Sequence, residues 1–223
     1  SNCAGSPYAS TSTDGSGAYS LLLESAYFGQ TVCVSATAGS YQASGANVAG
    51  AATPSGVQTV LNGVAYTYTR ASQQLSFSAP SSGAPVLNFG QVPPSTLTAS
   101  NSSTSSATSN ALNVSSGNYV VYAHSFTAGT AGSLTLVATS ASAGWTPVLY
   151  DDPTCAGTWS SGATPITGAL TLTQGQQRCF VVKQNAPLGL AAGATNVTTV
   201  SASLSLTNAN PLFALSTPNN LDT

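Results

Sequence analysis

Apolar and polar residues alternate along nearly the whole chain, and this periodicity limits the fold more than any other feature. Residues 200–207, for example, read Val-Ser-Ala-Ser-Leu-Ser-Leu-Thr. A period of two puts successive side chains on opposite faces of a β-strand, whereas an amphipathic helix repeats every three to four residues. No stretch of useful length in this chain has the helical spacing. The sequence therefore predicts an all-β protein.

Glycine- and proline-containing turns divide the alternating stretches at short intervals, as in "TDGSG", "PSSGAP" and "TQGQ". Short strands separated by regular turns are typical of β-sandwiches. We expect strands at residues 18–24, 30–37, 57–61, 65–70, 74–78, 85–90, 118–126, 132–139, 145–150, 168–173, 177–184 and 196–207.

The chain is predicted to form two consecutive β-sandwich domains, residues 1–92 and residues 93–223. The boundary is placed at "NFGQVPPSTL", where Pro93-Pro94 gives a stiff link. The Ser/Thr-rich tract at 99–110 follows it and is interpreted either as a flexible linker or as a solvated edge strand. With 223 residues, the chain is long enough for a proper hydrophobic core in each case.

The composition excludes several functional classes. Only 4% of the residues are charged, against about a quarter in ordinary soluble proteins. A nucleic-acid binder needs a basic patch, which three Lys and Arg residues do not supply. No apolar run reaches the roughly 18 residues that cross a bilayer, so we expect no membrane insertion. Serine, threonine, asparagine and glutamine must provide the solubility, which is typical of secreted fibrous proteins.

Four cysteines indicate an oxidising compartment. They form no C-x-x-C pair and have no histidine companion, so zinc and thioredoxin-like interpretations are weak. In each half a loop cysteine precedes a strand cysteine, and we expect disulfides between Cys3 and Cys33 and between Cys155 and Cys179. The strand cysteines in "TVCVSA" and "QRCFVV" lie on the face opposite their apolar neighbours. Reduced structural cysteines are the alternative.

The first half, with "CAGSPYASTSTDGSGAYSLLL" followed by "YFGQTVCVSA", resembles the prealbumin-like B-type modules of large bacterial surface proteins. The second half, with "YVVYAHSFTAGTAGSLTLVA" and "LTLTQGQQRCFVVKQNAP", resembles the Ig-like conserved repeat modules of very long secreted proteins. This resemblance implies extracellular, non-enzymatic modules. The chain departs from the B-type pattern because the usual first strand and the acidic calcium loop are missing, so domain 1–92 is expected to lack its first strand.

Few residues are candidates for chemistry. His124 is the only histidine, no nucleophile elbow accompanies it, and we expect it to be a hydrogen-bonded structural residue. Asp151 and Asp152 supply fewer oxygens than the six to eight that calcium requires. Asp14 is expected to cap its own turn. We therefore expect no catalytic residue, no metal and no cofactor.

Two covalent modifications remain open. Lys183 is the only lysine, and an amide cross-link from it to an asparagine would need a buried acid beside it. Asn101, Asn113 and Asn196 each begin an Asn-x-Ser/Thr triplet and are candidate glycosylation sites.

The function predicted from these features is a structural subunit or module of an extracellular bacterial filament, sheath or surface stalk, whose partners are further copies of itself in a linear polymer. The alternative is an adhesive module that binds surface glycans, with Tyr8, Tyr41, Trp145 and Trp159 as candidate aromatic contacts. Assembly is expected to be head-to-tail, with the tail 208–223 donating a strand to residues 1–35 of the next subunit. Within that tail Leu212, Phe213 and Leu215 are the expected anchors.

Overall fold

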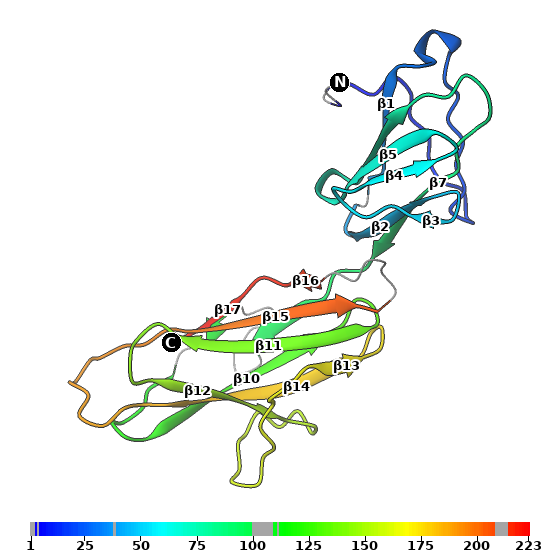
Figure 1. The fold of residues 1–223 in the computed structure, drawn as a ribbon. Helices are drawn as coiled ribbons and strands as arrows, with labels where there is room; N and C mark the ends of the chain where they lie inside the picture. The colour runs from blue at the N-terminus through cyan, green and yellow to red at the C-terminus, as the bar shows by residue number, and fades with distance from the viewer. Residues whose placement is uncertain (1–2, 4, 38, 100–108, 111, 208–213) are drawn as a thin grey trace. The chain divides into compact units, whose positions relative to one another are not determined.

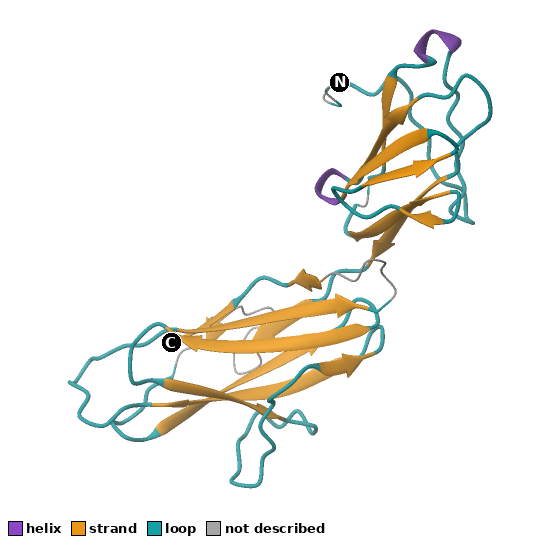
Figure 2. Ribbon diagram, in the orientation of Figure 1, coloured by secondary structure: helices purple, strands orange, loops and turns teal. Residues whose placement is uncertain are grey.

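The protein is all-β and consists of two consecutive β-sandwich units, residues Ser1–Gln91 and Val92–Thr223 (Figures 1 and 2). The structure is a computed structural model that describes residues 3, 5–37, 39–99, 109–110, 112–207 and 214–223. Within these residues no helix is long and apolar enough to span a membrane.

The first unit contains two antiparallel sheets. One has the strand order β1-β6-β5-β4 and the other β3-β2-β7. The elements are η1 (Ser25–Tyr27), β1 (Thr31–Ser35), β2 (Gln42–Val48), β3 (Ala51–Ala52), β4 (Gln58–Leu61), β5 (Val64–Thr69), η2 (Arg70–Ser72), β6 (Gln74–Ser78) and β7 (Leu87–Val92). Alternate residues of these strands point inward, and the buried core residues are Val48, Tyr66, Tyr68, Leu75, Phe77 and Leu87.

The strand expected at residues 18–24 is absent from the structure, so this prediction was wrong. The carboxylate of Asp14 accepts hydrogen bonds from the amides of Ser16 (2.8 Å) and Ala18 (2.9 Å), which forms a turn there. The side chain of Tyr19 then donates to the carbonyl of Leu87 at 2.8 Å. These contacts hold the segment without a neighbouring strand, because an alternating pattern forms a strand only where a ladder partner is present.

The second unit is a larger sandwich. One sheet has the order β12-β14-β10-β8, and the facing sheet has the order β13-β11-β15-β17-β9, with β16 also pairing with β15. The strands are β8 (Thr96–Ala99), β9 (Ser109–Asn110), β10 (Tyr119–Thr127), β11 (Gly132–Ser140), β12 (Thr146–Asp151), β13 (Leu170–Leu172), β14 (Gln177–Asn185), β15 (Thr198–Leu206), β16 (Ala214–Ser216) and β17 (Asn220–Asp222).

The core of this sandwich follows directly from the period-two pattern. In β15 every second residue from Thr198 to Leu206 is buried, and the residues between them are half-buried. Phe126 and Phe180 from one sheet and Leu134 and Leu204 from the other are fully enclosed between the two layers. Such burial is the main favourable term in folding.

The C-terminal segment differs from the expected donor strand. β16 pairs with Ser203–Ser205 of the same unit, with Leu215 opposite Leu204, and β17 pairs with Thr198–Val200. Leu215 is therefore bound within its own domain. Leu212 and Phe213 lie outside the described residues.

Candidate functional site: a disulfide-anchored loop on the second sandwich

A long loop of residues 152–169, anchored by a disulfide, lies outside the core of the second unit. We call it the cover loop. It connects β12 to β13 and begins with Asp152, whose side chain is buried. Its carboxylate accepts hydrogen bonds from the amides of Ala156 (3.1 Å) and Gly157 (2.7 Å) and from the hydroxyl of Thr154 (3.3 Å). Asp152 thus shapes the first turn of the cover loop.

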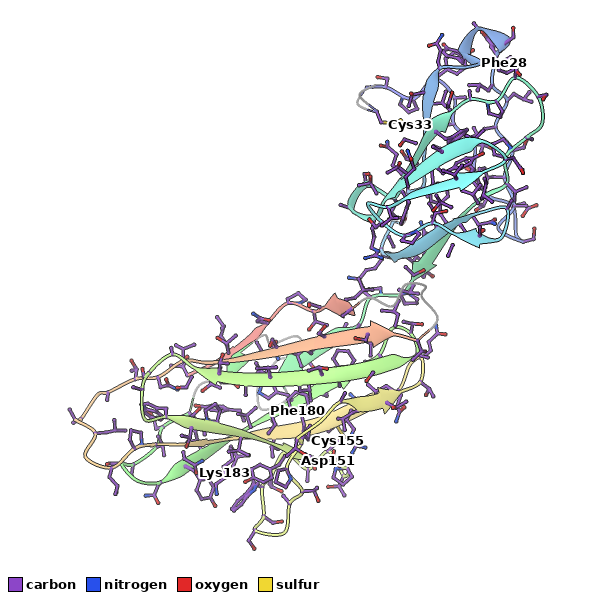
Figure 3. All side chains as sticks on the ribbon, viewed as in Figure 1. Phe28, Cys33, Asp151, Cys155, Phe180 and Lys183 are labelled. Atoms are coloured by element: carbon purple, nitrogen blue, oxygen red, sulfur yellow. A yellow bond between two sulfur atoms is a disulfide. The ribbon has the colours of Figure 1, made fainter. Side chains whose placement is uncertain are left out.

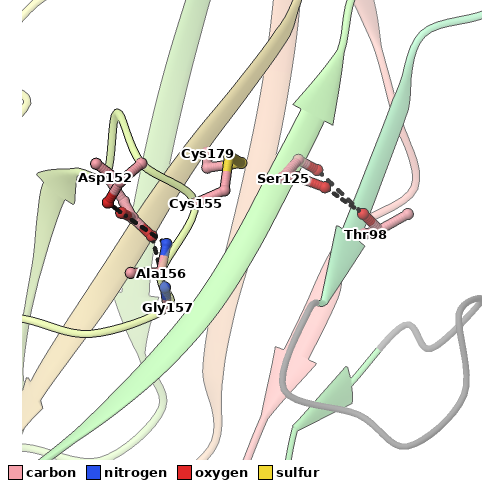
Figure 4. Close-up of a disulfide and its surroundings, with 8 residues drawn as sticks. Thr98, Ser125, Asp152, Cys155, Ala156, Gly157 and Cys179 are labelled. Carbon is pink, nitrogen blue, oxygen red and sulfur yellow. Dashed lines mark hydrogen bonds between the residues drawn. A yellow bond between two sulfur atoms is a disulfide. The ribbon is translucent and has the colours of Figure 1, made fainter.

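This turn positions Cys155 for its disulfide with Cys179 in β14 (Figure 4). Cys155 has a φ of 54°, in the left-handed region that residues with a side chain seldom adopt. The Cα atoms of Cys155 and Cys179 are 5.2 Å apart. Cys179 alternates with the inward-pointing Phe180, so the bond anchors the loop to the outer face of the sheet.

The cover loop then lies on this outer face and along its edge. A side chain at Gly157 would place its Cβ 3.1 Å from the Cβ of Ala123 in β10, which shows how closely the loop approaches the sheet. Further along, the amide of Asp151 donates to Thr164 and the amide of Ile166 donates to Leu149. The loop therefore also pairs with the outer edge of β12, which would otherwise be open to other strands.

Trp159 of the cover loop forms an aromatic cluster with two tyrosines of the sheet. Trp159 packs edge-to-face against Tyr119 of β10 and Tyr150 of β12, with ring centroids 5.3 and 5.7 Å apart. The ammonium of Lys183 lies 3.5 Å from the centroid of Trp159 and 4.2 Å from that of Tyr119. Figure 3 labels Lys183 on this sheet. We call these four residues the Lys183 cluster.

The environment of Lys183 does not match that of a cross-linking lysine. Such a lysine needs a carboxyl group beside it to relay a proton, but Lys183 contacts two aromatic rings. The carboxylates of Asp151 and Asp222 pair instead with Arg178 and His124, and that of Asp152 binds the cover loop. The amide cross-link is therefore not proposed.

His124 is buried and bound at both ring nitrogens. Its Nε2 lies 2.9 Å from Oδ2 of Asp222, and its Nδ1 lies 3.2 Å from the side-chain nitrogen of Asn220. Because the Asn220 amide can only donate, Nδ1 accepts and the proton resides on Nε2, which donates to Asp222. Both ring nitrogens are therefore engaged inside the core, as expected for a structural histidine. The ring also stacks on Phe180 at 5.3 Å.

Asp151 is ion-paired with Arg178, on the strand next to its own. Among the described residues, no three His, Cys, Asp or Glu side chains gather closely enough to hold a metal ion.

In the first unit, Cys3 is joined to Cys33 of β1, with Cα atoms 5.8 Å apart. Asp14 caps its turn as expected, and these hydrogen bonds, chiefly that from the Ser16 hydroxyl, lower the pKa of its carboxyl. Tyr8 packs on Tyr27 at 4.8 Å, and its hydrogen bond with Glu24 raises its pKa to about 12.

The candidate glycosylation sites differ in accessibility. Asn113 is exposed. Asn196 is buried, and its side-chain nitrogen, where a glycan would be attached, donates to Thr198 at 3.2 Å. The structure therefore does not fit a glycan at Asn196. Asn101 lies outside the described residues.

Two of the four candidate sugar-binding aromatics lie in each unit. Tyr8 and Tyr41 are exposed in the first unit. Trp145 lines a pocket of about 340 Å³ in the second unit, together with Asn113, Asn196 and the C-terminal Thr223. Trp159 belongs to the Lys183 cluster. Sequence reasoning missed this cluster because its members are brought together by strand register and by the disulfide.

Comparisons with known proteins assign no family. No protein-family model matches the chain. No curated protein matches it either. Among solved structures it is similar to BcpA, the major pilin subunit of Bacillus cereus, with 10% identity, a TM-score of 0.36, and coverage of 86% of this chain and 69% of that chain. At this TM-score, the likeness assigns neither a fold nor a function to this chain.

Proposed function

We propose that this chain is a non-enzymatic structural subunit or module of an extracellular bacterial filament, sheath or surface stalk, joined head-to-tail to copies of itself. The observation that carries the proposal is the unfinished edge at β1. Within the described residues β1 pairs with β6 alone, so its other side presents unpaired N–H and C=O groups. An edge of this kind is a template for a strand from another chain.

The packing beneath β1 supports this interpretation. Leu75 and Phe77 in β6 are buried, whereas their partners in the ladder, Val34 and Val32, are only half-buried. The apolar side chains of β1 therefore contact the core, but one side of them remains accessible to solvent. An added strand from a neighbouring copy would cover these valines and satisfy the backbone groups of the edge.

The donor in this proposal is not the segment 214–222. Those residues pair with β15, and Asp222 is buried against His124. Removing them would leave the ring nitrogens of the buried His124 without Asp222 and Asn220, and an unsatisfied buried polar group lowers stability. In the proposed head-to-tail assembly, a segment of the neighbouring copy other than residues 214–222 pairs with β1.

The extracellular location is supported by chemistry. Disulfides persist in oxidising compartments, and here each unit has its own. The outward-facing residues of β1 and β6 are mostly serine, threonine and glutamine, which keep the surface soluble with few charges.

Charged residues on the edge provide the test. Thr31→Lys with Ser35→Lys places two charges at exposed positions of β1, where they oppose strand addition without disturbing the core. The matched control is Gln58→Lys on β4, at the opposite edge of the same sheet. We expect filaments by electron microscopy for the unaltered chain and for the control, but none for the β1 variant. A monomeric unaltered chain at high concentration, or filaments from the β1 variant, would contradict the proposal.

A further inference from the structure

We propose that the Lys183 cluster is a binding site for a carboxylated saccharide, with Lys183 binding the carboxylate and the exposed ring of Tyr119 stacking on the sugar ring. This inference is independent of assembly, because it concerns a single copy of the second unit.

The uncompensated positive charge of Lys183 is the first observation that supports this binding site. The second unit has two cationic side chains, and Arg178 is neutralised by Asp151. Lys183 is half-buried and takes part in no ion pair of the described chain. The two rings stabilise its charge without neutralising it, because the attraction comes from their quadrupoles. A partly desolvated cation with hydrogen-bond donors to spare is suited to an incoming carboxylate.

The aromatic surface beside Lys183 indicates what kind of molecule carries the carboxylate. Tyr119 is 45% exposed although it contacts both Trp159 and Lys183. One face of a pyranose ring presents C–H groups, which match the electron-rich face of an aromatic ring. A carboxylate on a polypeptide would use Lys183 alone and would have no need of this flat face. The combination therefore favours an acidic sugar over an acidic peptide.

Two further polar groups lie at the cluster. The indole Nε1 of Trp159 is buried and has no hydrogen-bond partner among the described residues. An unpaired buried donor of this kind is costly. Asn185, opposite Tyr119 in the ladder, donates its amide to the carbonyl of Thr146 at 3.0 Å. Because Asn185 and Tyr119 are directly opposite in the ladder, their side chains share one face of the sheet, and the amide oxygen of Asn185 is a candidate acceptor for a sugar hydroxyl.

The test exploits the fact that Lys183 is the only lysine in the chain. Acetylation of the folded protein removes the charge of Lys183, whereas reductive dimethylation keeps it. Acetylation also neutralises the α-amino group, which dimethylation leaves charged, so acetylation of a Lys183→Gln variant measures the contribution of the amino terminus alone. The probe is tetragalacturonate, and its methyl ester is the neutral ligand of the same length and linkage. Binding is measured by calorimetry and by Trp159 fluorescence in a Trp145→Phe background, at concentrations where the chain is monomeric.

We expect saturable binding of the acid, weakening with salt, and a loss of about tenfold or more on acetylation but not on dimethylation. Tyr119→Ala should weaken binding similarly, while Tyr41→Ala, an exposed tyrosine of the first unit, should not. The melting temperature of the second unit serves as the folding control for each form. No saturable binding, equal binding of the ester, equal binding of tetraglutamate, or no effect of Tyr119→Ala in the folded protein would overturn the proposal.

Discussion

The imidazole of His124 in β10 and the carboxylate of Asp222 in β17 lie 2.9 Å apart in the interior of the second sandwich. The two strands belong to opposite sheets, so this contact spans the core and binds the C-terminal strand to the far layer. Gln184 and Thr198 make a similar connection at 2.6 Å. The last residues of the chain are therefore part of the domain, which is why the tail is not assigned as a free donor strand.

His124→Ala should destabilise the second unit by about 3 kcal/mol, because it leaves the buried Asp222 carboxylate without this partner. The measurement is denaturant unfolding followed by tryptophan fluorescence, since both tryptophans are in this unit. Asp14→Asn, at an exposed turn of the first unit, is the control and should not change this transition. An unaltered midpoint for His124→Ala would show that the contact across the core contributes nothing.

Gly129→Ala should destabilise the second unit by about 1–3 kcal/mol, the usual cost of overpacking. An added Cβ at Gly129 would lie 2.0 Å from the carbonyl oxygen of Pro93, so the backbone would have to move. Gly162→Ala is the matched control, because its Cβ would meet nothing within 4 Å. Thermal unfolding of the two variants provides the comparison, and equal melting temperatures would contradict the packing described at Pro93.

Replacing both Cys155 and Cys179 by alanine should loosen the cover loop while leaving the sandwich folded. In the chain-entropy model a disulfide closing a loop of this size stabilises by about 3 kcal/mol. We expect proteolysis to begin within residues 152–169 and the fluorescence of Trp159 to shift toward that of solvent-exposed tryptophan. Replacing Cys3 and Cys33 by alanine, as the control, should leave residues 152–169 resistant to the protease. Unchanged protease resistance of the cover loop would show that the disulfide does not anchor it.

Tyr122 makes the second unit sensitive to alkali. Burial, and to a smaller extent the charge of Asp222, raise the pKa of Tyr122 to about 12, from about 10 in an unfolded chain. The native state thus favours the neutral phenol, and this contribution to stability is complete below about pH 10 and is lost as the pH rises toward 12. Tyr122→Phe should therefore lose less stability than the unaltered chain across this interval. Parallel stability curves for the two proteins would contradict the assignment.

Much of the fold could be predicted because alternation is a local signal. The structure is all-β, and strands such as β6, β11 and β14 occur close to where the pattern places them. β2 was missed because Gln42–Val48 contains Gly45 and small or polar residues, so its pattern is weak without its partner strands. The strand at residues 18–24 was wrongly predicted for the opposite reason: the segment has a clear alternating pattern, but no neighbouring strand among the described residues pairs with it.

The candidate site was less predictable because it depends on register. Tyr119 and Lys183 are far apart in sequence, and they become neighbours only through the ladder between β10 and β14. The partners of His124 could not be identified either, since Asn220 and Asp222 are nearly a hundred positions away. The loop-to-strand cysteine spacing was the one local signal pointing to the cover loop.

Hydrogen exchange of the assembled and dispersed chain tests the central claim, that copies join through the edge of β1. We expect the amides of Thr31–Ser35 to become protected on assembly, while those of β17, already paired with β15, do not change. Protection that appears in residues 214–222 and not in β1 would contradict it.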